Sequence, residues 1–202
     1  MGVSSSRSFL IALLLLVGIM SNAVASDSDN YSGIQYSIID YEEAILGGTL
    51  ALEPSALVGR MGSFINRYLA LEARIGFGVS DNKARAVGND ASLGSFEGTL
   101  GADVESLLGV YALGDIAISS RSSVYGVIGI TSIDVGKTRL LTVNNTDTVS
   151  SETSSTENGL SYGFGTSIGI SGETSLNVEY MSYLDKSDFI VKSLNLGVLF
   201  NF

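Results

Sequence analysis

The chain of 202 residues contains no cysteine and no histidine. Without cysteine it can form neither a disulfide nor a reactive thiol. Without histidine it lacks the commonest general base and the commonest metal ligand. Charged residues are also scarce, at 16 % against an average near 25 % in soluble proteins. These absences exclude thiol and histidine chemistry, and we expect no cofactor and no metal centre.

The charge that is present is mostly negative. The formal net charge is −10, so the chain has no electrostatic reason to bind the phosphates of nucleic acid. Hydrophobic residues make up 45 %, with 24 glycines and one proline. This composition leaves two classes: a secreted β-sandwich, or a transmembrane barrel whose hydrophobicity is hidden in alternation.

The N-terminus reads as an export signal. Arg7 precedes an apolar run over residues 9–20, and Ala23-Val24-Ala25 forms a small-x-small cleavage site before a polar stretch. The run is 12 residues long, whereas a membrane-spanning helix needs about 20. The pattern therefore predicts a cleaved signal peptide at 1–25 and a mature domain at 26–202, rather than a helical anchor.

Period-two alternation recurs through the mature sequence and predicts β-strands. In residues 68–79, Leu69, Ile75 and Phe77 share one face, while Glu72 and Arg74 share the other. Eight segments follow this pattern, although the facing of the fifth cannot be assigned: 32–41, 56–65, 68–79, 104–116, 123–135, 160–170, 176–184 and 192–202. Their lengths suit tilted strands that cross a bilayer. They predict an all-β fold: a closed antiparallel transmembrane β-barrel of about eight strands.

The connections between these segments alternate in length. Those at 66–67, 119–122 and 171–173 are short, whereas those at 42–54, 80–103 and 137–158 are long and polar. Only 185–188 is a short connection on the long-loop side. This arrangement is typical of barrels with short periplasmic turns and long extracellular loops. The Ser/Thr-rich stretch 142–156 is expected to be a mobile loop. A sandwich is disfavoured because its exposed face would carry more charge than these Gly, Ser and Asn positions do.

Five charged residues are expected to face the lumen. They are Arg60, Glu72, Arg74, Glu105 and Glu179. The interior of an eight-stranded barrel is just wide enough for side chains to fill it. Buried charges must be paired, so we expect a salt-bridge plug. The alternatives are an open pore, or a carboxylate pair that performs acid–base chemistry. We expect no catalytic residue and no enzymatic activity.

The last eight residues resemble the assembly signal of outer-membrane barrels: polar-x-Gly-x-x-apolar-x-aromatic, carried by Asn195, Gly197, Phe200 and Phe202. This resemblance implies recognition by the barrel-assembly machinery. An edge strand of this kind is also a physical template for strand addition.

The mature chain as a whole resembles the outer-membrane β-barrel domain family of OmpA/OmpX-like small barrels. The resemblance rests on the stretch NRYLALEARIGFG at 66–78, on 31–36 for the first strand, and on 125–129. It implies an integral protein of the Gram-negative outer membrane that contacts membrane lipids and lipopolysaccharide.

Two functions remain open at this point. The first is a structural and surface-interaction role through long extracellular loops, adhesin-like, with an extracellular ligand that the loops do not specify. The second is a small channel for ions or small apolar solutes. The known barrel enzymes of this membrane use a catalytic histidine, as the families imply, and this chain has none.

Overall fold

The computed structural model describes residues 30–45, 48–90, 94–143, 147–186 and 189–202. The predicted signal peptide at 1–25 lies outside them. The described chain forms ten strands: β1 (Asn30–Ile45), β2 (Gly48–Leu52), β3 (Ser55–Asn66), β4 (Leu69–Ser80), β5 (Asn82–Asp90), β6 (Gly94–Ala117), β7 (Ser122–Val143), β8 (Asp147–Gly169), β9 (Thr174–Lys186) and β10 (Phe189–Asn201). Within these residues there is no helix long and apolar enough to cross a membrane.

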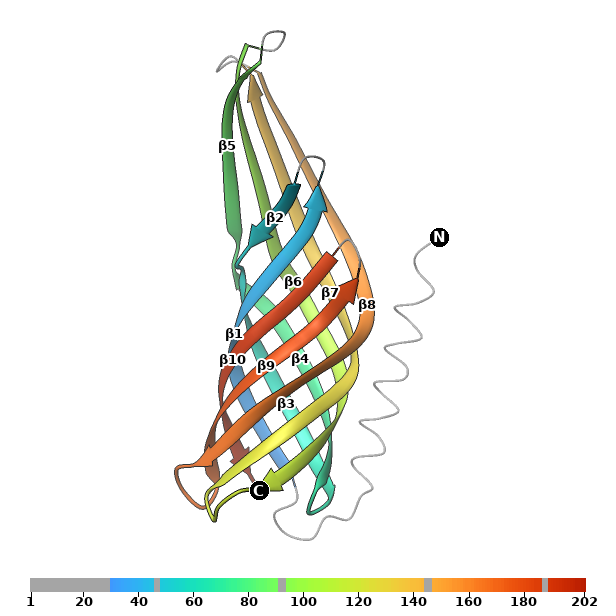
Figure 1. Ribbon diagram of the computed structural model, residues 1–202, viewed down its shortest axis with the longest axis vertical. Coiled ribbons are helices and arrows are strands. Elements are labelled where there is room, and N and C mark those ends of the chain that lie inside the picture. The colour runs from blue at the N-terminus through green and yellow to red at the C-terminus, as the bar shows by residue number, and fades with distance from the viewer. Residues whose placement is uncertain (1–29, 46–47, 91–93, 144–146, 187–188) are drawn as a thin grey trace.

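Eight of the strands close into an antiparallel ring in the order β1, β3, β4, β6, β7, β8, β9, β10. The ring is closed by β1 against β10, in a register that runs from Tyr31 opposite Asn201 to Glu43 opposite Phe189. At the foot of this seam the Phe202 amide donates to the Asn30 carbonyl at 2.9 Å. Figure 1 shows the closed barrel with the C-terminus at its lower end, beside the short turns. The predicted closed barrel of eight strands is confirmed.

The lipid face and the lumen face alternate as the sequence predicts. On β4, Ile75 is 60 % exposed on the outside, whereas Arg74 is 1 % exposed on the inside. The structure also assigns the facing of β7: Val124, Ile128 and Ile130 point outward, and Tyr125 and Val127 point inward. An outward band of large apolar side chains is the surface that a bilayer solvates.

The long polar connections are not loops. β1 continues to Ile45 and turns into β2, β5 fills much of 80–103, and β7 and β8 extend to Val143 and from Asp147. The expectation of a mobile loop at 142–156 is therefore wrong outside its undescribed residues 144–146. Thr and Val favour strands, and each extended strand finds a backbone partner in its neighbour.

The result is an outer sheet, which we define as β5 with the adjoining parts of β6, β7 and β8 at residues 94–104, 135–143 and 147–155. β6, β7 and β8 have 24, 22 and 23 residues, against 12 to 16 in the other ring strands. Figure 1 shows β5 to β8 rising above the rest of the barrel as one ribbon. By the rule of short periplasmic turns, this sheet stands on the extracellular side.

Two β-bulges change which side chains face the lumen. On β6, Val104 pairs with Val135 and Ser106 with Asp134, so that Glu105 is an extra residue. On β9, Leu184 pairs with Val191 and Ser182 with Lys192, so that Tyr183 is extra. Leu184 consequently lies fully buried, although strict alternation placed it on the lipid face.

Candidate functional site

The middle of the lumen contains a cluster of four charged side chains, brought together from three strands. Arg60 comes from β3, Glu72 and Arg74 from β4, and Glu179 from β9, and all four are at least 97 % buried. The strand register places Arg60 directly opposite Arg74. This juxtaposition of like charges is offset by the two carboxylates, so the cluster of two cations and two anions is neutral overall.

Each arginine bridges the carboxylates by close contacts. Arg60 Nη2 lies 2.8 Å from Glu72 Oε2 and 3.7 Å from Glu179 Oε2. Arg74 Nε lies 2.5 Å from Glu72 Oε1. The other two nitrogens of Arg74 donate to both oxygens of Glu179, at 2.6 and 2.8 Å. Such fork-to-fork pairing is the strong geometry for a guanidinium and a carboxylate.

Neutral polar groups complete the coordination of the cluster. Tyr31 donates to Glu72 at 2.7 Å, Asn195 donates to Glu179 at 3.0 Å, and Gln35 accepts from Arg60 Nη1 at 3.1 Å. The Tyr111 ring lies under Arg74, with the guanidinium carbon 4.5 Å from its centroid. A buried charge network is stabilising only when its members are satisfied in this way.

Sequence reasoning missed the tyrosines of this network. It assigned neither Tyr31 nor Tyr125 to the lumen, and the structure buries both there. The alternation in β1 contained the signal, because Tyr31 has the opposite parity to the outward residues Ile34 and Tyr36. Glycine makes room for one of these rings: a Cβ on Gly62 would overlap Tyr31.

The prediction that Glu105 lines the lumen is wrong. Glu105 is the extra residue of the β6 bulge, and its side chain is exposed on the outer surface. Its Oε2 accepts a hydrogen bond from the Ser154 hydroxyl at 2.8 Å, on the outer sheet. Glu105 shares its odd numbering with the inward residues from Leu107 to Leu113, so alternation placed it in the lumen. The bulge between them turns its side chain outward.

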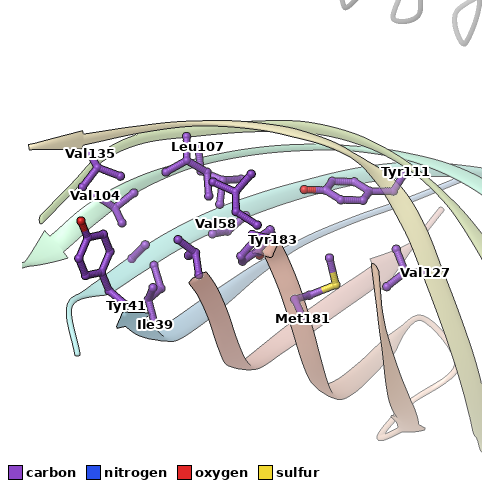
Figure 2. Close-up of a cluster of buried hydrophobic side chains, with 14 of the residues drawn as sticks. Ile39, Tyr41, Val58, Val104, Leu107, Tyr111, Val127, Val135, Met181 and Tyr183 are labelled. Atoms are coloured by element: carbon purple, nitrogen blue, oxygen red, sulfur yellow. The ribbon is translucent and has the colours of Figure 1, made fainter. Parts of the chain in front are cut away.

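An apolar layer covers the charged cluster on its extracellular side. Ile39, Val58, Leu107, Ile133 and Tyr183 are all fully buried there. Figure 2 shows Ile39, Val58, Leu107 and Tyr183 converging from different strands, with Tyr41, Val104 and Val135 further toward the mouth. This layer was not predicted from the sequence, because a plug of salt bridges alone was expected. The fully buried side chains of the layer fill the lumen above the ion pairs.

The mouth of the barrel is tied together by a contact across strands. Lys137 of β7 donates to Glu43 of β1 at 2.7 Å, and Tyr41 donates to the other Glu43 oxygen at 2.8 Å. The Tyr41 ring meets Phe189 of β10 edge to face, with centroids 5.2 Å apart. Burial alone would raise the pKa of Glu43, but the hydrogen bonds from Lys137 and Tyr41 outweigh it, and the pKa lies below its ordinary value.

The residues of the predicted assembly signal lie at the barrel seam: three on β10, and Phe202 directly after it. Asn195 and Gly197 face inward and Phe200 and Phe202 face outward, with Phe202 63 % exposed. A Cβ on Gly197 would lie 2.5 Å from Asn177 Oδ1 and 2.8 Å from the Gln35 Cβ, so only glycine fits beside the cluster. Recognition of this strand by the assembly machinery stays a prediction.

The periplasmic half of the lumen holds a cavity of about 190 Å³ beneath the cluster. Tyr31, Phe64, Leu113, Asp115 and Tyr125 are among its lining residues, and Arg60 also borders it. The guanidinium of Arg60 is already engaged by Glu72 and Gln35. The cavity therefore ends at the cluster, because the ion pairs and the apolar layer close the lumen on the extracellular side.

Comparison with known proteins agrees with this architecture. The profile of the outer membrane protein beta-barrel domain matches residues 9–202. The chain thus belongs to the outer membrane protein beta-barrel domain family, and it is a protein of the Gram-negative outer membrane. A comparison with curated protein sequences gave no match.

Solved structures of small outer-membrane barrels share the fold. Ail, the attachment invasion locus protein of Yersinia pestis, has 14 % identity and a TM-score of 0.53, over 88 % of this chain and 100 % of Ail. The N-terminal β-barrel domain of Pseudomonas aeruginosa OprF has 13 % identity and a TM-score of 0.50, over 87 % and 100 % of the two chains. A major outer membrane protein of Thermus thermophilus also reaches 0.50 at 13 % identity, over 86 % and 99 %.

Proposed function

We propose that this protein is a non-enzymatic outer-membrane barrel with a closed lumen, which acts on the cell surface through its outer sheet. The observation that carries the proposal is the two-layer plug: a buried cluster of paired charges lies beneath a fully buried apolar layer. A plugged lumen offers no aqueous path, and the short turns offer little surface. The outer sheet is the largest surface that remains, and rigid scaffolds commonly carry their function on such projections.

The same geometry argues against catalysis. Glu72 and Glu179 are the best-placed pair of carboxylates, and both are occupied by arginines and closed off from solvent. A general acid or base must be within reach of a substrate proton. No substrate reaches this pair without the barrel opening.

The chemistry of the outer sheet suggests its kind of ligand. On β8, the exposed side chains at residues 151–154 of this sheet are hydroxyls and one acid: Ser151, Glu152, Thr153 and Ser154. Ail has been crystallised with the heparin analogue sucrose octasulfate, a polyanion. The net charge of −10 here disfavours a polyanion and favours a neutral or cationic partner. The lipid face would contact membrane lipids and lipopolysaccharide in the usual way.

A trimmed variant tests this proposal. Replacing residues 139–151 by a two-residue turn removes the top of the β7–β8 ribbon but keeps the pairing of Thr138 with Glu152. We expect normal heat-modifiable migration and unchanged outer-membrane levels, with loss of cell adhesion or ligand capture. A matched control trims the β1–β2 hairpin instead. If adhesion and capture assays give the same result for full-length and trimmed protein, the surface role is refuted.

The rival function is a small channel. Single-channel recording of the purified protein in planar bilayers separates the two, because a closed lumen gives no steps while a hydrated pore gives them. A variant with Arg74→Ala and Glu179→Ala, which empties part of the cluster, serves as a comparison. Steady conductance of the unmodified protein would overturn the closed-lumen assignment.

A further inference from the structure

The outer sheet ends in two strand edges that have no backbone partner among the described residues. β5 is paired with β6 on one side. β8 meets β9 from Tyr162 onward, so its upper part, above Glu157, is paired with β7 alone. The base of each edge is covered, by Lys186 contacting Glu157 at 2.6 Å and by Asn82 donating to the Glu53 carbonyl at 3.4 Å. Above these contacts both edges expose the N–H and C=O groups that template strand addition.

The directions of the two edges are complementary. All neighbours in the sheet are antiparallel, so β5 and β7 run away from the membrane while β6 and β8 run toward it. Two copies inserted in one membrane stand the same way up. The β5 edge of one copy therefore meets the β8 edge of another in antiparallel orientation. Pairing of β8 with β8, or of β5 with β5, would be parallel.

The charges at the two edges are complementary as well. Lys83 pairs with Gly101, Gly101 with Thr138, and Thr138 with Glu152, so Lys83 and Glu152 end one cross-strand row on the same face. Within a single chain, Lys83 Nζ lies 2.7 Å from an Asp81 carboxylate oxygen, and both side chains are 55 % exposed. Pairing of two β8 edges would place Glu152 of one copy against Glu152 of the other. Pairing of a β5 edge with a β8 edge places Lys83 of one copy against Glu152 of the other.

We propose that the outer sheet is a self-association surface: the β5 edge of one copy adds to the β8 edge of the next and continues the antiparallel sheet from molecule to molecule. The partner is thus a second copy of this chain rather than a foreign ligand, and this association does not depend on the surface role proposed above. The contact is head-to-tail, so it leaves a free edge at each end and builds rows rather than closed dimers. The membrane assists by holding all copies upright at one height, which removes much of the orientational cost of association.

Cysteine cross-linking tests this in a chain that has no cysteine of its own. Ala84 and Ser151 end the next cross-strand row, through Leu100 and Arg139. A chain carrying Ala84→Cys and Ser151→Cys, oxidised on intact cells, is expected to give a ladder of dimers, trimers and higher species on non-reducing gels. A mixture of the two single variants should stop at the dimer. The double variant Ala84→Cys with Ser171→Cys, whose second site is in a periplasmic turn, should give no ladder.

Charge reversal then tests the contact between Lys83 of one copy and Glu152 of the next. Lys83→Glu or Glu152→Lys alone should lower the cross-linked yield by about two- to fivefold, the range expected for one exposed ion pair, and the two changes combined should restore it. Heat-modifiable migration shows that each variant is folded. The proposal is overturned if folded protein gives no ladder, if Ser151→Cys alone dimerises as strongly as the mixture, or if the cysteines are captured by a different polypeptide.

Discussion

Removing Arg74 should destabilise the barrel more than any other single change in the lumen. Its guanidinium makes three contacts with carboxylate oxygens, at 2.5, 2.6 and 2.8 Å, and its side chain is fully buried. Arg74→Met keeps most of the volume but leaves two buried carboxylates facing a single arginine. Breaking a buried ion pair from one side costs about 3–5 kcal/mol. This would be a large fraction of the stability of a small domain.

The assay is denaturant unfolding of protein refolded into lipid vesicles. The chain contains no tryptophan, so the folded fraction is best read from the shift between heated and unheated samples on a gel. The matched control is Glu105→Ala, a charged residue of the same barrel on its exposed surface, for which we expect a change within about 0.5 kcal/mol. Equal midpoints for the two variants would mean that the lumen is hydrated and that the plug reasoning fails.

A double-mutant cycle shows which contact of Arg74 contributes to the free energy of unfolding. Arg74→Met and Glu179→Gln should couple, because each removes the partner of the other, and coupling between contacting groups runs to about 0.5–3 kcal/mol. Arg74→Met and Glu105→Ala should be additive, since Glu105 lies on the outside of the barrel. Additivity of both pairs would contradict the contacts described here.

Three further predictions concern the mouth, the outer sheet and the last strand. The lowered pKa of Glu43 implies a stabilisation that is present at neutral pH and is lost as the pH falls through that pKa, so Glu43→Gln should make the acid limb of a stability profile shallower. Burial and the nearby charges of Glu105 and Asp81 raise the pKa of Asp103, so its ionisation opposes folding at neutral pH and Asp103→Asn should raise the thermal midpoint; a lowered midpoint would count against it. Changing Phe200 and Phe202 to Ser should lower outer-membrane levels without blocking export, as seen by fractionation, because these are the exposed aromatic residues at the end of β10 and directly after it; unchanged levels would show that another element is recognised.

Much of the barrel could be predicted because strand alternation is a local property. Successive side chains of a strand point to opposite faces, so Ile75 outside and Arg74 inside follow from their parity alone. The inward facing of Arg60, Glu72 and Glu179 was accessible in the same way. Pairing of these charges follows from the narrow interior of an eight-stranded barrel.

Register and bulges could not be predicted, because they depend on the neighbouring strand. Glu105 has the parity of a lumen residue, yet the pairing of β6 with β7 makes it an extra residue on the outside. The bulge at Tyr183 likewise turns Leu184 inward. A bulge of one residue reverses which face of the sheet every later side chain of that strand points to. No local sequence pattern in β6 or β9 indicates that a bulge is present.

The sequence alone indicated the class of this protein: few charges, recurrent alternation and a final aromatic strand favour a barrel in a membrane, and such a barrel must be closed because only closure pairs every backbone group there. The tertiary structure decided which side chains meet in the lumen and which segments form the outer sheet. Closure by β1 and β10 brought Glu179 to Arg74 across more than a hundred residues, and it stacked an apolar layer on the ion pairs. Pairing between long strands turned polar segments into an outer sheet, since an extended Ser/Thr-rich chain becomes ordered only when a neighbouring strand accepts its hydrogen bonds.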